Sequence, residues 1–250
     1  MTKYRHPRGI MIVAFALLAS LFSAHAADKN PSAVIELFTS QGCSSCPPAD
    51  KILSDYAKQD DVLALSWHVD YWNYLGWRDT FSDERFTDRQ RRYAVSFARR
   101  GVYTPQAVVN GRNHVVGSRL ADIEALRTAY QSSGKGLTVP LETQRIGKAV
   151  HISAKADAGD ATLWIVYFDR QKQVQIERGE NRGRTISYHN VVRDFSVLGM
   201  MTDGQVDVTL PLAELKKKGF DSCAILLQET TSSGTPGAII GATVLQDMEG

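Results

Sequence analysis

The chain has 250 residues, of which 43% are hydrophobic and 22% charged, so it can bury the core of one large domain or of two modest ones. Its three cysteines are too few for a fold built mainly on disulfides, which excludes that class of small secreted scaffold. The formal net charge of +2 shows no strong excess of either sign.

The first 26 residues have the pattern of a secretory signal peptide. Three basic residues precede an apolar run over residues 10–22, and a small-residue cleavage site at residues 24–26 follows. We expect cleavage near Ala26 and a periplasmic or secreted mature chain. No later segment approaches the roughly 20 apolar residues of a spanning helix, so we expect no membrane span after cleavage.

The next segment predicts a strand, a helix and a second strand. Residues 33–38 form a short apolar strand, a helix opens at Pro47-Pro48, and residues 62–69 form a strand that is apolar on both faces. Proline suits the first turn of a helix, where backbone N–H groups lack an intrahelical acceptor. The three elements together make a βαβ unit.

The rest of this half continues the α/β pattern. We predict an aromatic segment at 71–77, a helix over 82–100, strands over 106–109 and 114–116, and a helix over 120–130. Asn110-Gly111 between the two strands is a strong signal for a tight hairpin.

Residues 132–136 read as a linker, after which the pattern becomes mainly β. Seven short strands are predicted over 149–154, 162–168, 173–178, 184–192, 205–210, 223–228 and 238–245. Such a series is typical of a sandwich. The predicted organisation is therefore a leader (1–26), an α/β domain (27–134) and a mainly β, sandwich-like domain (137–250).

The motif Cys43-Ser44-Ser45-Cys46 immediately precedes the predicted helix. A helix start stabilises a thiolate, so we expect the Ser45 and Cys46 N–H groups to point at the Cys43 sulfur. The Cys43 pKa should then lie between roughly 3.5 and 7.5 rather than about 8.5. Cys46 should be more buried. Cys43 is thus predicted to attack a disulfide and Cys46 to resolve the mixed disulfide.

These features, with Thr104-Pro105 leading a β-hairpin and a last helix, resemble the thioredoxin superfamily. More narrowly, the chain resembles a family of secreted bacterial proteins labelled only as a domain of unknown function. The runs that carry this resemblance are ELFTSQGCSSCPPAD (36–50), HVDYW (68–72), YTPQ (103–106), GENRGRT (179–185) and YHNVV (188–192). They extend over nearly the whole mature chain.

The resemblance implies that Pro105 is a cis proline facing the two cysteines and that Thr104 helps to hold substrate backbone. The chain departs from the thioredoxin pattern in two places. Leu37 occupies the position of the buried acid, with Glu36 one residue away. Ser-Ser lies between the cysteines, and Gly42 precedes them where thioredoxins usually have Trp. Both departures bear on proton handling and reduction potential.

His68 and Asp70 lie at the carboxyl end of the second strand, where ligand sites of open α/β sheets gather. Residues two apart on a strand share a face, so we expect the two side chains to be neighbours. They could shuttle a proton during exchange. The structural alternative is a buried His–Asp pair that fixes the following aromatic segment.

Four further features have mainly structural interpretations. The aromatic segment 71–77 could form a peptide-binding wall or lid, or simply fill a core. Cys223 lies in an apolar strand and reads as an inert buried thiol. The polar hairpin from Glu177 to Asn190 offers an anion or partner site through Arg182, Arg184, His189 and Asn190. The basic run Arg85, Arg89, Arg91, Arg92, Arg99 and Arg100 reads as a solvated helix face, and without stacking aromatics it does not predict nucleic-acid binding.

Three functions remain open on the sequence. The leading one is an exported thiol–disulfide oxidoreductase without a cofactor or resident metal, acting on exported protein thiols and disulfides or on small thiols, with a redox partner protein. The second is a non-enzymatic binding protein with a static Cys43–Cys46 disulfide, although so short a loop removes little chain entropy. The third is copper or zinc binding through the two cysteines and His68 or His114.

Overall fold

A computed structural model describes residues 30–157, 159–217 and 219–245 of the protein. The predicted leader, residues 1–26, lies outside the described residues. None of the helices in these ranges is both long and apolar enough to cross a membrane.

The N-terminal half follows the predicted order. Its elements are β1 (Ala33–Thr39), α1 (Pro47–Tyr56), β2 (Val62–His68), η1 (Asn73–Leu75), α2 (Glu84–Ser96), β3 (Gln106–Val109), β4 (Asn113–Val116) and α3 (Leu120–Ser132). β1 pairs in parallel with β2 and antiparallel with β3. The predicted βαβ unit and hairpin are therefore confirmed, and Asn110 and Gly111 both have positive φ as the tight turn requires.

Helix α2 is shorter than the predicted helix over 82–100. The Asp83 side chain caps its start by accepting the Arg85 N–H, so the helix begins at Glu84. Its end comes at Ser96, because Ala98 has a φ of 52° and leaves the helical conformation. Gly101 lies beyond the end of the helix.

The C-terminal half is mainly β, as predicted. Its elements are β5 (Glu142–Ile146), β6 (Ala149–Lys155), β7 (Ala161–Gln175), β8 (Thr185–Met200), β9 (Gln205–Pro211), α4 (Leu212–Lys217), β10 (Ser222–Thr230) and β11 (Pro236–Leu245). The strands predicted over 162–168 and 173–178 are one strand, because β8 pairs with the polar stretch between them. β5 and α4 were not predicted; β5 is mostly exposed and has no apolar alternation.

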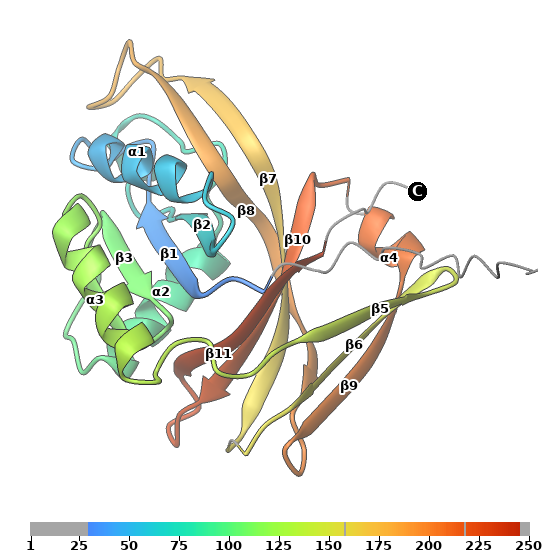
Figure 1. Cartoon of the computed structure of the whole chain (residues 1–250). Coiled ribbons are helices and arrows are strands. Elements are labelled where there is room, and N and C mark those ends of the chain that lie inside the picture. The colour runs from blue at the N-terminus through green and yellow to red at the C-terminus, as the bar shows by residue number, and fades with distance from the viewer. Residues whose placement is uncertain (1–29, 158, 218, 246–250) are drawn as a thin grey trace, which may run out of the picture.

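Strands from both halves form one eight-stranded sheet in the order β11-β10-β7-β8-β2-β1-β3-β4. The junction is the parallel pairing of β2 with β8, at Ser66 and Val191. A second sheet, β5-β6-β9, faces the C-terminal strands across a hydrophobic core (Figure 1). Two stacked sheets make the C-terminal half sandwich-like.

Two further cores lie on either side of the N-terminal strands. One, beneath α1 and α3, contains Leu37, Leu53 and Ile123. The other, beneath α2, combines Phe38 and Trp67 with residues of β7, β10 and β11. This second core is therefore built by both halves of the chain.

The outer ends of β7 and β8 extend past the edge of the sheet and lie beside α1 (Figure 1). The loop that joins them, residues 176–184, reaches the segment between β1 and α1 through Asn181. The C-terminal half thus contributes directly to the surroundings of the two cysteines.

Candidate functional site

Cys43 and Cys46 lie in the loop between β1 and α1 and form a disulfide with a Cα–Cα distance of 5.4 Å. Cys46 is the N-cap residue of α1, and Pro47 and Pro48 occupy the first turn. The predicted position of the motif at a helix start is confirmed.

The two cysteines differ slightly in exposure. Cys43 has 2% of its surface exposed and Cys46 has none, which agrees with the predicted order of burial. The surrounding loops enclose Cys43 more than an open thiol site would require.

The Cys43 sulfur is in contact with two hydroxyl groups. Thr104 Oγ1 donates to Cys43 Sγ at 3.2 Å, and Ser45 Oγ lies 3.4 Å from the same atom. Trp72 Nε1 donates in turn to Thr104 Oγ1 at 2.8 Å. The Thr104–Pro105 peptide bond is cis, as the resemblance implied.

Of the Ser45 and Cys46 N–H groups expected to point at the Cys43 sulfur, that of Cys46 donates to a carbonyl oxygen instead. The Cys46 N–H donates to the Cys43 carbonyl oxygen at 3.2 Å, and the Cys43 N–H donates to the Ser40 carbonyl oxygen at 3.1 Å. The loop makes tight turns that use these donors internally. Hydroxyl groups of Ser45 and Thr104 take their place beside Cys43 Sγ.

The departure at Gly42 has a steric reason. A Cβ at this position would lie 3.2 Å from Trp72 Cβ and 3.3 Å from the Trp72 carbonyl oxygen. Gly42 therefore lets the aromatic segment come close to the cysteine loop.

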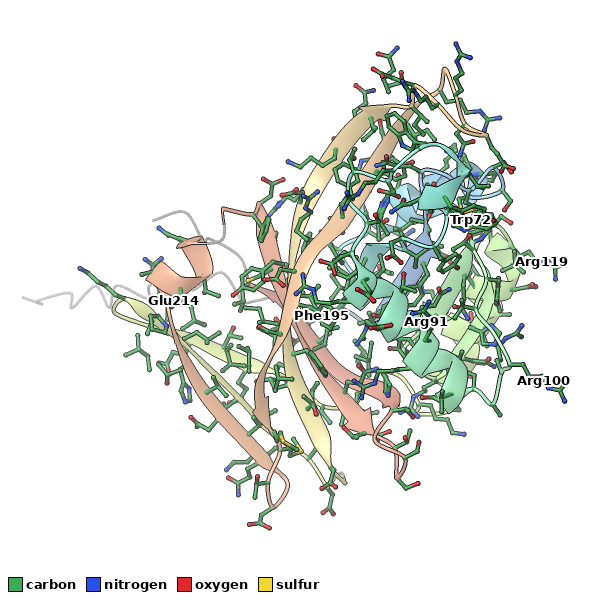
Figure 2. All side chains as sticks on the ribbon, turned by 180° about the vertical axis from the view of Figure 1, so that it is seen from behind. Trp72, Arg91, Arg100, Arg119, Phe195 and Glu214 are labelled. Carbon is green, nitrogen blue, oxygen red and sulfur yellow. A yellow bond between two sulfur atoms is a disulfide. The ribbon has the colours of Figure 1, made fainter. Side chains whose placement is uncertain are left out.

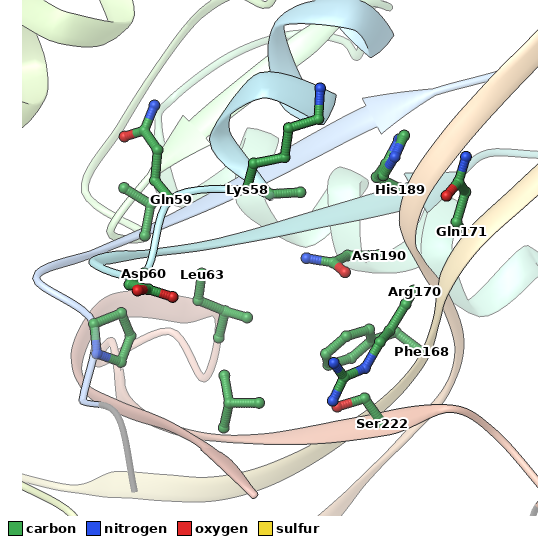
Figure 3. Close-up of a pocket in the computed structure, with 14 residues that line it drawn as sticks. Lys58, Gln59, Asp60, Leu63, Phe168, Arg170, Gln171, His189, Asn190 and Ser222 are labelled. Carbon is green, nitrogen blue, oxygen red and sulfur yellow. The ribbon is translucent and has the colours of Figure 1, made fainter. Parts of the chain in front are cut away.

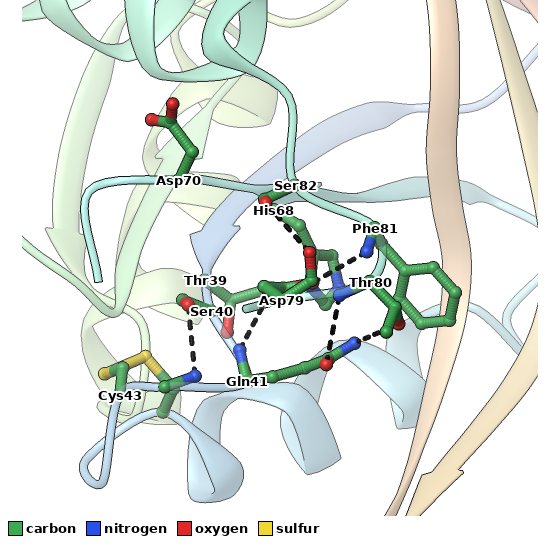
Figure 4. A network of polar contacts seen from close by, with 12 residues as sticks. Thr39, Ser40, Gln41, Cys43, His68, Asp70, Asp79, Thr80, Phe81 and Ser82 are labelled. Atoms are coloured by element: carbon green, nitrogen blue, oxygen red, sulfur yellow. Dashed lines mark hydrogen bonds and ion pairs between the residues drawn. A yellow bond between two sulfur atoms is a disulfide. The ribbon is translucent and has the colours of Figure 1, made fainter. Parts of the chain in front are cut away.

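His68 is buried and pairs with an aspartate, but its partner is Asp79 and not Asp70 (Figure 4). β2 ends at His68, so the alternation of the strand no longer positions Asp70. Asp70 instead accepts a hydrogen bond from Thr87 Oγ1 of α2 at 2.6 Å. The predicted His68–Asp70 neighbourhood is wrong.

Asp79 ties the aromatic segment to the cysteine loop. It accepts from His68 Nδ1 at 2.7 Å and from the backbone N–H groups of Gln41 and Phe81, both at 2.8 Å. Gln41 Oε1 also accepts from Trp77 Nε1 at 2.9 Å. A buried His–Asp pair thus fixes the aromatic segment, which matches the structural alternative with a different aspartate.

The aromatic segment serves two purposes. Trp72 and Trp77 are held by hydrogen bonds to Thr104 and Gln41 beside the cysteines. Tyr74, in contrast, is 78% exposed. The tryptophans form a fixed wall next to Cys43, and Tyr74 extends outward from it.

Asn181 anchors the β7–β8 loop over the motif. Its buried Nδ2 donates to the carbonyl oxygens of Gln41 and Cys43, both at 2.9 Å. Two residues suggested for an anion site have structural contacts: His189 Nδ1 lies 2.7 Å from Ser54 Oγ, and Asn190 Nδ2 donates to the Ala64 carbonyl oxygen. Burial lowers the pKa of His189, so its ring is neutral near pH 7.

Glu36 does not take the place of the buried acid expected near the cysteines. Glu36 and Leu37 are adjacent on β1 and point to opposite faces. Glu36 is buried with Arg89 and accepts from its Nε at 2.8 Å, with Tyr93 and Gln228 beside the pair. Arg89 is therefore an exception to the predicted solvated arginine face, whereas Arg91 on α2 and Arg100 beyond the end of the helix are exposed (Figure 2).

Cys223 is fully buried in β10, and burial raises its pKa to about 12. This confirms the interpretation as a buried thiol. For the metal alternative, no group of three or more His, Cys, Asp or Glu side chains within 30–157, 159–217 and 219–245 is arranged to hold an ion. His114, one of the two histidines of the metal alternative, has its Nδ1 2.8 Å from the Tyr103 hydroxyl oxygen.

A cavity of about 700 Å³ lies at the C-terminal end of α1, the end opposite the disulfide (Figure 3). Lys58, Arg170, His189 and Ser222 are among its lining residues. None of the six predicted site residues lines it.

Sequence reasoning missed Asp79, Asn181 and Asp50 as members of the site. Asp79 and Asn181 reach the loop from distant segments, and no spacing in the sequence links them to it. Asp50 could have been found, because it follows Cys46 by four residues, which is one helical turn. Its carboxylate accepts from Thr39 Oγ1 at 2.7 Å inside the protein.

Comparisons with known proteins agree with this architecture. A family model described as "Protein of unknown function (DUF1223)" matches residues 34–228. A "Probable Thioredoxin" of Archaeoglobus fulgidus is 32% identical over 84 residues, which are 34% of this chain and 72% of the relative. The N-terminal half is thus thioredoxin-like, with its CxxC pair at the start of α1.

Two solved structures are similar over most of the chain. The crystal structure of protein AGR_C_4864 from Agrobacterium tumefaciens has a TM-score of 0.77 at 41% identity and covers 89% of this chain and 96% of its own. HBP35 of Porphyromonas gingivalis has a TM-score of 0.59 at 15% identity, covering 86% and 75% respectively. The second likeness concerns the fold alone.

Proposed function

The chain belongs to the DUF1223 family of proteins of unknown function, and we propose that it catalyses thiol–disulfide exchange through Cys43 and Cys46. One observation carries the proposal. The Cys43–Cys46 disulfide lies at the start of α1, and the hydroxyl group of Thr104, at the cis peptide bond, donates a hydrogen bond to Cys43 Sγ.

In the proposed reaction the reduced Cys43 is the nucleophile. Its thiolate attacks a disulfide, forms a mixed disulfide and releases one substrate sulfur as a thiolate. Cys46 then attacks Cys43 Sγ and releases the second. The hydroxyl groups of Thr104 and Ser45 supply hydrogen bonds that favour the Cys43 thiolate.

The proposed substrates are thiols and disulfides of exported proteins, or small thiols, because the leader predicts export. Cys43 is almost fully buried, and Thr104 and the Asn181 loop contact it directly. An extended, unfolded segment or a small thiol suits so enclosed a cysteine better than a folded surface. A dithiol or small thiol would return the pair to the reduced state.

Turnover of a peptide disulfide in the presence of excess dithiothreitol tests the proposal. The wild-type protein should accelerate the reaction, and Cys43→Ser and Cys46→Ser should each abolish the acceleration. In a separate reaction without dithiothreitol, reduced Cys46→Ser should accumulate a mixed disulfide between Cys43 and the peptide, visible by mass spectrometry, whereas Cys43→Ser should not. Cys223→Ala is the matched control and should leave turnover unchanged. A wild-type protein that does not accelerate exchange would overturn the proposal.

The enclosure of Cys43 supports one competing candidate, a static disulfide in a binding protein. A bridge that closes so short a loop constrains the unfolded chain only weakly. If the disulfide is static, it should resist reduction by dithiothreitol in the folded protein, and neither cysteine variant should change the rate of exchange of the peptide disulfide.

A further inference from the structure

Four buried side chains near the CxxC motif, Asn181 among them, each leave one polar atom without a hydrogen-bond partner in the described part of the chain, and the other three lie on α1, β2 and β8. These three atoms are Asp50 Oδ2 on α1, His68 Nε2 on β2 and Tyr188 Oη on β8. Buried polar atoms are nearly always paired, and an unpaired one needs an explanation. Here three come from three different elements.

These three side chains form one cluster. The rings of His68 and Tyr188 lie edge to face, with centroids 4.7 Å apart. Asp50 of α1 lines a groove together with residues 185–187 of β8, the strand that carries Tyr188. Burial raises the pKa of Tyr188, and the charge of Asp50 raises it further. The unpaired atoms therefore share one buried region beside the cysteine loop.

The hydrogen bonds of Asp79 fix the position of His68. Asp79 accepts from two backbone N–H groups and from His68 Nδ1, as an ionised carboxylate does (Figure 4). The Asp79 carboxylate therefore holds the Nδ1 side of the His68 ring. His68 Nε2 is left as an unpaired atom that faces the interior.

Asp50 lies one helical turn beyond Cys46. Its backbone N–H donates to the Cys46 carbonyl oxygen at 3.0 Å. Residues four apart on a helix have Cβ atoms about 5–6 Å apart on the same face. Cys46 is fully buried, so water has no direct access to its thiol, whereas Asp50 is 4% exposed and lines a groove between α1 and β8.

The surroundings of Asp50 keep its carboxyl group near the midpoint of titration at neutral pH. Burial raises the pKa to about 7, and the hydrogen bond from Thr39 opposes this rise. The groups that face it are Thr39 from β1, His68 from β2, Asp79 from the segment after η1 and Tyr188 from β8. Lys51 and Arg184 line the adjoining groove.

We propose that the Asp50 carboxylate, through its unpaired Oδ2, accepts the proton that leaves the Cys46 thiol in the second step of exchange. This inference rests on the proposed function. Thr39, His68 and Tyr188 act as positioning residues that surround the carboxyl group and set its charge.

The Cys46 thiol gives its proton to Asp50, and its sulfur forms a bond with Cys43 Sγ. The bond between Cys43 Sγ and the substrate sulfur breaks, and the electron pair leaves with the substrate as a thiolate. The dithiol is oxidised by two electrons and the substrate disulfide is reduced by two. Asp50 then releases the proton to water in the groove.

Stopped-flow reaction of the reduced protein with dithiobisnitrobenzoate separates the two steps, because each releases one coloured thiolate. In the wild type the second release should become faster as pH rises through about 7 and then level off. In Asp50→Asn it should be slower by about a hundredfold at neutral pH, since the general base is lost. Its rate should then keep rising with pH. The first release should be unchanged.

Asp55→Asn is the matched control, because Asp55 is an exposed carboxylate on the same helix that pairs with Lys51 and Lys58. It should leave both releases unchanged. An Asp50→Asn variant whose second release keeps the wild-type rate and pH profile would overturn this inference alone. A wild-type protein that gives no first release from Cys43 would overturn the proposed function and this inference with it.

Thr39→Val provides a test that does not depend on the folding of Asp50→Asn. It removes the hydrogen bond that lowers the Asp50 pKa. In Thr39→Val the pH at which the rate of the second release increases should therefore be higher than in the wild type. The rate on the high-pH plateau should stay the same. An unshifted profile would contradict the role of Asp50.

Discussion

Asp50 couples the protonation of the site to the stability of the fold. Its pKa is raised by burial from an ordinary 3.8 to about 7. Between these values the folded protein binds a proton that the unfolded chain releases. The stability contributed by this group is therefore complete below the unfolded pKa and is lost as pH rises through the folded pKa.

The comparison of wild type with Asp50→Asn makes this measurable. The free energy of unfolding of the wild type should fall relative to the variant by about 1.4 kcal/mol per pH unit inside the window from pH 3.8 to about 7. Below and above the window the difference should be constant. Urea unfolding at several pH values measures this difference. If the free energies of unfolding of the two proteins changed in parallel across the window, the raised pKa of Asp50 would be contradicted.

Thr104→Val tests the hydroxyl group on the Cys43 sulfur. A hydrogen bond to a charged group contributes about 1.5–3 kcal/mol, so its loss should raise the Cys43 pKa by about one unit or more. The pH dependence of iodoacetamide labelling of reduced Cys43 gives this pKa. Thr128→Val, an exchange on the outer helix α3, is the control. An unchanged midpoint would show that Thr104 does not stabilise the thiolate.

At the residue scale, chemistry carried by contiguous residues could be predicted and chemistry assembled across the chain could not. The order of burial of Cys43 and Cys46 followed from their places at a helix start. The partner of His68 could not be predicted, because both Asp70 and Asp79 follow it in the chain and the strand ends before Asp70. The use of the Cys46 N–H inside the loop depended on turns that the sequence does not specify.

The β7–β8 hairpin is the element that most clearly exceeds the thioredoxin pattern around the site. Its strands run past the edge of the sheet, and its loop attaches to the cysteine loop through Asn181. Two hydrogen bonds from one amide are a small attachment. The tip of the hairpin therefore lies directly against the cysteine loop at Gln41 and Cys43.

Asn181→Ala should loosen this attachment. Loss of the two bonds should cost about 1–3 kcal/mol of stability and make reduction of the disulfide by dithiothreitol faster, since Cys43 becomes easier to reach. Glu180→Ala, at the exposed neighbouring position, should change neither quantity. Equal reduction rates in wild type and Asn181→Ala would show that the loop does not limit access.

At the element scale, helices α1, α2 and α3 and most strands could be predicted because their apolar spacing is regular. β7 appeared as two strands because its middle carries polar residues such as Asp169 and Lys172. Pairing with β8 keeps this stretch extended, and pairing partners are not visible in local composition. β5 was not predicted because its side chains are mostly exposed and show no apolar alternation.

The whole molecule is joined through one sheet and one shared core. β2 and β8 meet at a single register position, and residues of β7, β10 and β11 pack with those of β1 and β2. A buried ion pair reinforces this junction, because Arg89 of α2 contacts Glu36 of β1 and Gln228 of β10. The two halves should therefore unfold together.

Arg89→Met tests this link. It leaves Glu36 buried without its partner, so the free energy of unfolding should drop by about 3–5 kcal/mol. Arg91→Met, at an exposed pair with Asp88 on the same helix, should cost less than about 1 kcal/mol. Guanidinium unfolding followed at both halves should give one coincident transition in the wild type. Two separate transitions would contradict a shared core.

At the scale of the molecule, the fold class of each half could be predicted, whereas their union in one sheet could not. The βαβ start and the series of short strands each have a local signature. The β2–β8 junction rests on one pairing position between segments 125 residues apart, Ser66 and Val191. Nothing in either segment marks the other as its neighbour. The boundary near residue 134 remains a prediction.

The equilibrium reduction potential of Cys43–Cys46, measured against defined ratios of reduced and oxidised dithiothreitol in a Cys223→Ala background, distinguishes a pair that exchanges disulfides from a static disulfide. A pair that exchanges disulfides should have a potential above about −300 mV and reach equilibrium reversibly from either side. A potential well below that value, with no reaction in the folded protein, would show that the disulfide is static.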